Sequence, residues 1–192
     1  MHRATEGAIT LPLPRLEVPR PETGARSAGG PAASLSLDQV SALLWAGFGL
    51  NRHGSGGRAP FADPRIPPVA VYALLAEGAY RYDVREHRLL MLTPGDIRTR
   101  RRAAGAVPAA LVLVYVEDDR CAEDPGTEEC GVLSGIGAVS IADGVAAYCA
   151  SAGLEATAEQ HADPRLATSL RLVPGERIAF VQGVRRAAPA AH

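Results

Sequence analysis

Residues 69–83 read VAVYALLAEGAYRYD, and this stretch sets the kind of fold that the chain can form. Its first half is apolar and has the length of a strand, and a turn near Glu77-Gly78 interrupts it. Its second half runs on as another strand through Tyr80 and Tyr82. The stretch therefore predicts a β-hairpin, and residues 87–92 are expected to extend the same sheet.

The sequence on both sides of the hairpin predicts helices and further strands. Val40, Leu43 and Leu44 recur at the spacing of one helix face, so residues 36–46 predict a helix. Ser36 is its expected N-cap and Gly49 its expected stop. The other expected elements are a short basic helix over 94–105, a central buried strand over 107–117, a long helix over 133–152, a helix over 163–172 begun by Asp163 and Pro164, and a last strand over 177–184. This order predicts an α+β fold with helices around one sheet.

The long helix over 133–152 contains many small residues, among them Gly135, Gly137 and Gly144. A glycine in a helix interior costs about 1 kcal/mol relative to alanine, so several of them indicate that something approaches the helix closely. We interpret them as close packing against a neighbouring helix, and direct contact with a ligand is the alternative. Arg98 and the arginines that follow it are expected to form a solvated face, with phosphate binding as the alternative.

The composition fits one globular domain. The chain has 192 residues, of which 47% are hydrophobic, and a formal net charge of -1, which argues against a nucleic-acid-binding protein with a basic face. All 20 basic residues are arginine, so no lysine is present for a Schiff base, a phosphate-binding loop or a general base. Residues 1–33 predict an extended or partly disordered arm, residues 34–186 the domain, and residues 187–192 a frayed tail.

The cysteines and the N-terminal residues predict a cytoplasmic protein with reduced thiols. No signal peptide and no apolar run of about 20 residues is visible, so no membrane span is expected. Cys121 and Cys130 enclose CAEDPGTEEC, which predicts a turn-rich surface loop. A metal site needs more ligands at close spacing, and thiol redox chemistry needs a closer cysteine pair, so neither is expected here.

Several stretches, taken in order, resemble one known family. They are LSLDQVSALLWAGFGLNR (35–52), GGRAP (56–60), VYALLAEGAYRYDVREHRL (71–89) and the segment from Ile141 to Arg185. Together they look like the flavin-dependent nitroreductase superfamily, above all its short members related to the azoline dehydrogenases of peptide-heterocycle biosynthesis. The resemblance covers about residues 22–186. It implies a nitroreductase-like α+β fold with a mostly antiparallel central sheet, and a homodimer with an FMN at each of two interface sites.

The resemblance also implies which residues hold FMN, through two motifs in the first third of the chain. The first motif places Arg26 near the phosphate or the ribityl chain and Ser27 near the ring edge, although Ala25 and Gly29 stand where the family has arginines. A disordered tail is the alternative for Arg26 and Ser27. The second motif reads Arg58, Ala59, Pro60 and Phe61, and here Phe61 replaces a serine that forms a hydrogen bond.

Two further FMN contacts are implied in the second half. The backbone N–H groups of a loop holding Ala158, Glu159 and Gln160 are expected near the flavin N5 and O4. Arg185 and Arg186 are expected to contact the phosphate, which arginine binds well, and solvation at the chain end is the alternative.

The family chemistry is hydride transfer through the flavin, often with NAD(P)H as the electron donor. Tyr148, Glu159 and His161 are the candidates for delivering a proton to a small-molecule or peptide substrate, and a solvent-exposed loop histidine is the alternative for His161. Because Ala25, Gly29 and Phe61 depart from the motifs, a second hypothesis stays open. It is a non-catalytic or repurposed member of the fold, either a partner subunit of another enzyme or a binder of another ligand.

Overall fold

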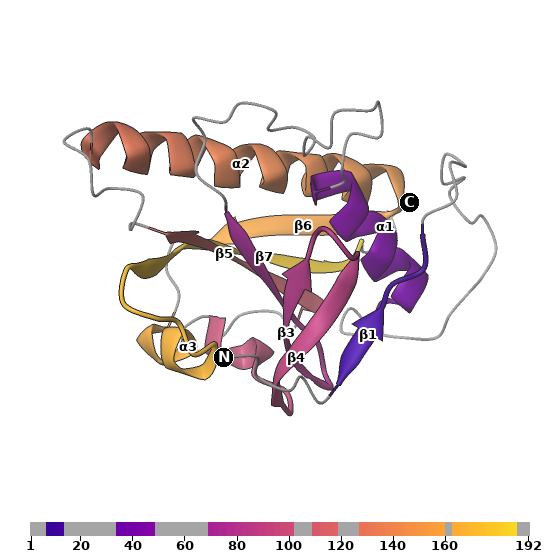
Figure 1. Cartoon of the computed structure of the whole chain (residues 1–192). Helices are drawn as coiled ribbons and strands as arrows, with labels where there is room; N and C mark the ends of the chain where they lie inside the picture. Colours follow the sequence, from indigo (N-terminus) through magenta and orange to yellow (C-terminus); the bar gives the residue numbers. More distant parts are fainter. Residues whose placement is uncertain are drawn as a thin grey trace.

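The computed structural model describes most of the chain, and the strands of the described part form one sheet. The described residues are 7–13, 34–48, 69–101, 109–118, 127–159 and 163–187. Neighbouring strands are all antiparallel, in the order β1 (Ala8–Thr10), β4 (Arg88–Pro94), β3 (Gly78–Asp83), β2 (Ala70–Leu74), β5 (Leu111–Asp118), β7 (Glu176–Arg186) and β6 (Leu154–Glu159) (Figure 1). This arrangement confirms the predicted α+β class with an antiparallel sheet flanked by helices.

Helices lie on both faces of the sheet. The helices α1 (Leu37–Phe48) and α2 (Thr127–Ser151) pack on one face, and α3 (Pro164–Ser169) packs on the other with the short 3-10 helix η1 (Arg98–Arg101) (Figure 1). Each face therefore has its own hydrophobic core.

The central strand β5 separates these two cores. Its odd-numbered residues from Leu111 to Tyr115 pack with α1 and α2, and its even-numbered residues from Val112 to Val116 pack with α3. A strand that is buried on both faces reads as a continuous apolar run. The prediction of a central buried strand is confirmed, with the bounds Leu111–Asp118.

The β2–β3 hairpin forms where the sequence predicts it. The N–H of Leu75 donates to the carbonyl oxygen of Gly78 at 2.9 Å, which closes the turn. A Cβ atom at Gly78 would lie 2.6 Å from the carbonyl oxygen of Thr93 on β4. Glycine is therefore required at the start of β3, and β4 extends the sheet as expected.

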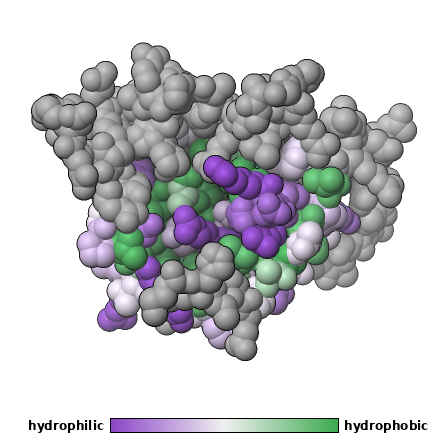
Figure 2. All heavy atoms as spheres, in the orientation of Figure 1, coloured by the Kyte–Doolittle hydropathy of each residue, from purple (hydrophilic) through white to green (hydrophobic). Residues whose placement is uncertain are grey.

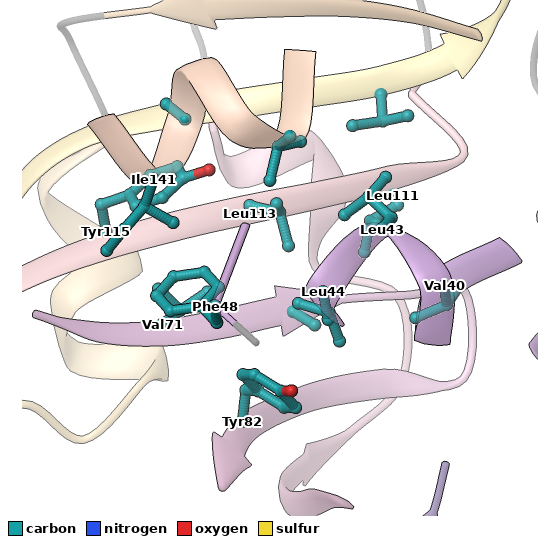
Figure 3. Packing of buried hydrophobic residues seen from close by; sticks show 14 of the residues in the cluster. Val40, Leu43, Leu44, Phe48, Val71, Tyr82, Leu111, Leu113, Tyr115 and Ile141 are labelled. Atoms are coloured by element: carbon teal, nitrogen blue, oxygen red, sulfur yellow. The ribbon is translucent and has the colours of Figure 1, made fainter. Parts of the chain in front are cut away.

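Helix α1 begins with a reciprocal cap. Gln39 N–H donates to Ser36 Oγ at 3.2 Å, and Ser36 N–H donates to Gln39 Oε1 at 3.0 Å. This capping box confirms Ser36 as the N-cap, whereas the expected stop at Gly49 lies outside the described residues. From α1, the side chains of Leu43, Leu44 and Phe48 point into the core above the sheet (Figure 3).

Two glycines allow α1 and α2 to cross closely. A Cβ atom at Gly47 would lie 2.7 Å from Val145 Cγ2, and one at Gly144 would lie 3.2 Å from the carbonyl oxygen of Ala46. Real Cβ atoms do not tolerate the first of these distances, so the helix backbones can approach this far only because the side chains are missing. For Gly144, the interpretation of close packing against a neighbouring helix is confirmed.

Three segments differ from the sequence-based expectation in the first two-thirds of the chain. Residues 8–10, predicted within an extended arm, form β1 and pair with β4. The long helix begins at Thr127 instead of 133, so Cys130 is helical and does not close a loop. Within the described residues, the basic helix predicted over 94–105 is only the 3-10 turn η1.

Arg98 does not belong to the solvated face that the sequence predicted, because its guanidinium is bound by other groups of the chain. Its guanidinium pairs with Asp96, with Nη2 2.7 Å from Oδ2, and also donates to the carbonyl oxygens of Ala109 and Ala110 at 3.0 and 2.9 Å. The hydrogen bond between the two side chains raises the pKa of Arg98 and lowers the pKa of Asp96. Arg98 therefore anchors the chain just before β5.

Three segments near the C-terminus also differ. Residues 154–159 form strand β6 where a turn and a loop were expected. Helix α3 has Asp163 as its N-cap, as predicted, but it ends at Ser169 because Arg171 takes a left-handed backbone with φ 55°. The last strand, β7, is longer than predicted at both ends.

The described part of the face shown in Figure 2 is mixed, with strongly hydrophilic residues beside apolar ones. Among the described helices, none combines the length and the apolarity needed to cross a bilayer.

Candidate functional site

The fold brings four of the predicted cofactor residues onto one pair of strands. Ala158 and Glu159 lie on β6, and Arg185 and Arg186 lie on the neighbouring strand β7. In the antiparallel register Ala158 lies opposite Gln182, which is three residues before Arg185. At about 3.4 Å per strand residue, the two predicted contact regions are about 10 Å apart along the sheet. We call this pair of strands the β6–β7 edge, because β6 is the last strand of the sheet.

Arg186 has a buried atom without a partner. It lies opposite Leu154, whose side chain belongs to the core under α1 and α2. Within the part of the chain that the structure describes, its Nε is buried and has no hydrogen-bond partner. A buried donor without a partner costs about 1–3 kcal/mol, so such an atom marks a place where an acceptor is missing.

Arg185 already has an anionic partner. Its Nε and Nη2 donate to the two carboxylate oxygens of Glu155 at 2.9 and 2.7 Å, across the β6–β7 pair. The Arg185 guanidinium holds the pKa of Glu155 below its ordinary value, and Glu155 raises the pKa of Arg185. Any phosphate that binds Arg185 must therefore compete with this carboxylate.

Ala158 and Glu159 lie at the other end of β6. The sequence-based expectation placed them in a loop, but both belong to the strand. Ala158 is exposed and Glu159 is partly buried. One edge of β6 pairs with β7, and no other described strand pairs with its second edge. The backbone N–H groups that point outward from this edge are the kind of donor that the family resemblance implies for the flavin ring.

A buried polar bridge, which sequence reasoning missed, lies directly beside Ala158. Tyr115 O–H donates to Gln182 Oε1 at 2.6 Å, and Gln182 Nε2 donates to the carbonyl oxygen of Ala142 on α2 at 3.1 Å. Burial raises the pKa of the Tyr115 phenol, so this hydroxyl stays a donor. The bridge joins β5, β7 and α2 at the position where β6 is paired. Nothing in the local sequence pattern around Gln182 predicts it.

Tyr148 does not come together with Glu159. It lies on α2 six residues beyond Ala142, which is about 9 Å of helix rise, whereas the bridge from Gln182 to Ala142 marks the level of Ala158. Burial raises the pKa of Tyr148, and the neighbouring Cys149 adds to this effect. The two candidates therefore lie at different levels along the β6–β7 edge.

Cys149 is the one described cysteine with a buried free thiol. Burial raises its pKa to about 12, so the thiol is protonated at neutral pH and is no nucleophile. In the described ranges, no group of three His, Cys, Asp or Glu side chains is close enough to hold a metal ion.

The remaining predicted site residues fall outside the described ranges. They are Arg26, Ser27, Arg58, Ala59, Pro60, Phe61, Gln160 and His161, together with Ala25, Gly29 and Cys121.

Comparison with known proteins identifies the family. No protein-family model and no curated protein matches the sequence. Among solved structures, a protein of Ralstonia eutropha JMP134 that is provisionally named a nitroreductase is 30% identical, with a TM-score of 0.80 over 98% of this chain and 93% of its own.

Two more distant structures share the fold. One is part of the E. coli microcin synthetase McbBCD complex with truncated pro-MccB17 bound, with 14% identity and a TM-score of 0.71 over 87% of this chain and 72% of that chain. The other is an FMN-dependent nitroreductase of Clostridium difficile R20291, with 13% identity and a TM-score of 0.51 over 83% and 81%. The fold and the identity over nearly the whole length lead to one conclusion: the chain belongs to the nitroreductase family.

Proposed function

We propose that this protein is an FMN-dependent oxidoreductase that acts as a homodimer and takes its electrons from NAD(P)H. The observation that carries the proposal is the β6–β7 edge. There, two separate parts of the sequence that resemble cofactor motifs lie on neighbouring strands, and one of them contains a buried arginine Nε that has no acceptor among the described residues. The family membership and the FMN-dependent relative with the same fold support the same proposal.

The residues of this edge fit a flavin phosphate and ring. The orphaned Nε of Arg186 suits a phosphate oxygen, since arginine pairs with phosphate through charge-assisted hydrogen bonds. The unpaired edge of β6 suits the polar rim of a flat ring, because backbone donors do not depend on side-chain identity. Bound FMN would supply the hydride transfer itself.

The chain would contribute binding, orientation and exclusion of water. Arg186 would hold the phosphate on the face of the sheet that α2 covers. Arg185 leaves the opposite face of β7 and would have to reach the phosphate past the strand end once Glu155 releases it. The backbone at Ala158 and Glu159 would orient the ring, and the Gln182 bridge would keep this strand at a fixed distance from α2. Glu159, on the same strand, is then the described candidate for proton delivery beside the ring.

The homodimer part of the proposal is supported by the outer face of α2. Ile136 and Val139 lie one turn apart there and are 51% and 52% exposed. Exposed apolar residues at helical spacing suit burial against another subunit. Sedimentation velocity of the purified protein tests this part directly, with a dimer as the expected species.

A partner-subunit role is the second candidate function. The replacement of the motif serine by Phe61 and the occupation of Arg185 by Glu155 both weaken the case for a tightly held cofactor. The related fold inside the McbBCD complex makes a subunit role in a larger assembly a concrete alternative.

The absorption spectrum of the purified protein decides between the two functions. The protein is saturated with FMN and desalted, and we expect a flavin band of about one FMN per chain that NADH or NADPH bleaches under anaerobic conditions. If no flavin remains after saturation, the proposed function is wrong. A retained flavin that neither nicotinamide reduces would instead overturn the assignment of the electron donor.

A further inference from the structure

His87 is a buried histidine at the opposite end of the sheet from the β6–β7 edge. It ends the turn between β3 and β4, is 4% exposed, and has a left-handed backbone with φ 47°. Its carbonyl oxygen accepts the N–H of Leu11 at 3.1 Å. Its ring lies edge-on to Trp45 of α1, with ring centroids 5.0 Å apart. The backbone and the side chain of His87 therefore both face the chain that follows β1.

Both ring nitrogens of His87 form hydrogen bonds with buried hydroxyls. Nε2 lies 2.8 Å from Ser41 Oγ on α1, and Nδ1 lies 2.7 Å from the hydroxyl oxygen of Tyr82 on β3. Ser41 Oγ in turn contacts the carbonyl oxygen of Pro12, just after β1. Figure 3 shows Tyr82 on its strand near Phe48 of α1, so the network lies within the hydrophobic core between the sheet and the helices α1 and α2.

The Pro12 carbonyl oxygen determines the directions of these hydrogen bonds. A carbonyl oxygen only accepts, so Ser41 O–H donates to Pro12. Ser41 Oγ must then accept from His87, so Nε2 carries the proton of the neutral ring. Nδ1 has no proton and accepts from Tyr82 O–H. The network is complete only while His87 is neutral, because a second ring proton on Nδ1 would force the Tyr82 hydroxyl to accept and would leave the Tyr82 hydrogen without its acceptor.

Among the described residues, no other ionising group replaces His87 in this role. The segment of residues 7–13 (GAITLPL) has no ionisable side chain, and α1 presents Ser41 and Trp45 to the ring. Burial raises the pKa of Tyr82, so its phenol stays protonated. On the turn itself, Asp83 is paired with Arg88 at 3.1 Å, and the side chains of Arg85 and Glu86 are exposed.

We propose that His87 is a pH-sensitive attachment point for the N-terminal segment, residues 7–13, and that protonation of its ring releases this segment while the rest of the fold persists. Protonation places a charge on the buried ring and a donor on Nδ1 that has no matching acceptor. Water can reach the charged ring at the lowest cost if residues 7–13 move away from it. This is because β1 has only three residues and, among the described strands, pairs only with β4. Short terminal elements open locally at lower cost than the core. This inference does not depend on the proposed cofactor.

The direction of the pH effect follows from the environment of the ring. Burial lowers the pKa of His87 below its ordinary value of 6.5, and the nearby backbone of Pro12 opposes part of that shift. With the segment released, the ring is hydrated and returns toward its ordinary pKa. Between the lowered pKa and 6.5 the released state therefore binds more protons, and falling pH favours release.

Amide hydrogen exchange of the full chain, followed by NMR from pH 7.5 to pH 5, tests the proposal. The reporters are Leu11 N–H, which donates to His87, and Met91 N–H, which donates to Gly7. After correction for the intrinsic exchange rate, we expect their opening to increase below about pH 6.5, by up to about tenfold per pH unit. The amide of Val114 in the central strand is expected to stay protected.

Two variants separate His87 from a general effect of acid. In His87→Asn the new side chain tolerates the left-handed backbone and does not ionise, so the opening of Leu11 and Met91 is expected to be independent of pH. In Thr93→Val a comparable hydrogen bond, from Thr93 Oγ1 to the carbonyl of Ser169, is removed elsewhere on β4, and the pH response is expected to persist.

Three results would overturn the proposal. They are a flat exchange profile in the unaltered protein, an unchanged pH response in His87→Asn, and a parallel loss of protection at Val114, which would mean that acid unfolds the whole domain. If His87→Asn does not fold, Ser41→Ala provides the second test, because it breaks the link to Pro12 and is expected to open Leu11 at neutral pH while the ring still titrates.

Discussion

The two ends of the sheet differ in how their buried polar groups are matched. At the β1 end, His87, Ser41 and Tyr82 form a closed set with the Pro12 carbonyl, and every donor has an acceptor. At the β6 end, Arg186 has a buried Nε without a described acceptor.

The difference indicates that the buried polar groups of the β1 end are matched within this chain, whereas the β6 end lacks a hydrogen-bond acceptor among the described residues. A network that is complete within one chain stabilises the fold of that chain and gains nothing from a ligand. An orphaned buried donor is tolerated when a ligand or another subunit completes it. The contrast therefore supports a structural role for the β1 end and a binding role for the β6 end, and substitutions at the two ends should separate stability from binding.

Tyr82→Phe should cause the largest change in stability. It removes the hydroxyl that donates to His87 Nδ1 and leaves a buried acceptor unmatched. We expect the free energy of unfolding to fall by about 1–3 kcal/mol, measured by urea denaturation at pH 7.5.

Tyr148→Phe is the matched control for this substitution. Its ring is partly buried on α2, and its hydroxyl forms no hydrogen bond with the described residues. We expect a change within about 0.5 kcal/mol. Equal losses in the two variants would remove the distinction between a matched network and an ordinary tyrosine.

Arg186→Met should separate binding from stability at the other end. The substitution removes the orphaned Nε and keeps most of the side-chain length, so the free energy of unfolding should not fall. It should rise by up to about 1 kcal/mol, the lower end of the cost of an unmatched buried donor, because Arg186 is only partly buried. If the proposed phosphate contact exists, FMN affinity should fall by about ten- to a hundredfold. Fluorescence titration of FMN measures the affinity.

Arg165→Met is the charge-matched control for this experiment. Arg165 is exposed on α3, on the other face of the sheet. Removing it changes the net charge in the same way, and FMN affinity should stay within about twofold because salt screens distant charges. If Arg165→Met weakens binding as much as Arg186→Met, the effect is one of net charge and not of a local contact.

The elements predicted correctly from the sequence are those with a strong local signal. The turn at Glu77-Gly78, the continuous apolar run that became β5, and the Asp163 cap each specify their structure within a few residues. Strands β1 and β6 lack such a signal. The sequence of β1 is AIT, and LEATAE of β6 contains small and acidic residues that strands disfavour. Both exist because a neighbouring strand pairs with them.

The candidate site could be predicted only in part for a related reason. Family resemblance named Ala158, Arg185 and Arg186, but their juxtaposition depends on the β6–β7 register. The pairing of Arg185 with Glu155 and the network around His87 join residues that are distant in sequence or share no motif. No period or spacing along the chain specifies such contacts.

Glu155→Gln has the smallest expected effect and tests the role of Arg185 at the β6 end. Glu155 holds Arg185 by two hydrogen bonds and competes for it with any phosphate at the β6–β7 edge. The amide keeps the size of the side chain and removes its charge, so FMN should bind about two- to fivefold more tightly, in line with the modest strength of exposed ion pairs.

Arg185 holds the pKa of Glu155 below its ordinary value of 4.5. The variant should therefore keep its advantage at every pH down to about 4.5 and lose it only below, where Glu155 of the unaltered protein becomes protonated. An unchanged affinity in Glu155→Gln, with Arg186→Met still impaired, would mean that Arg186 alone holds the phosphate and that Arg185 serves to join the two strands.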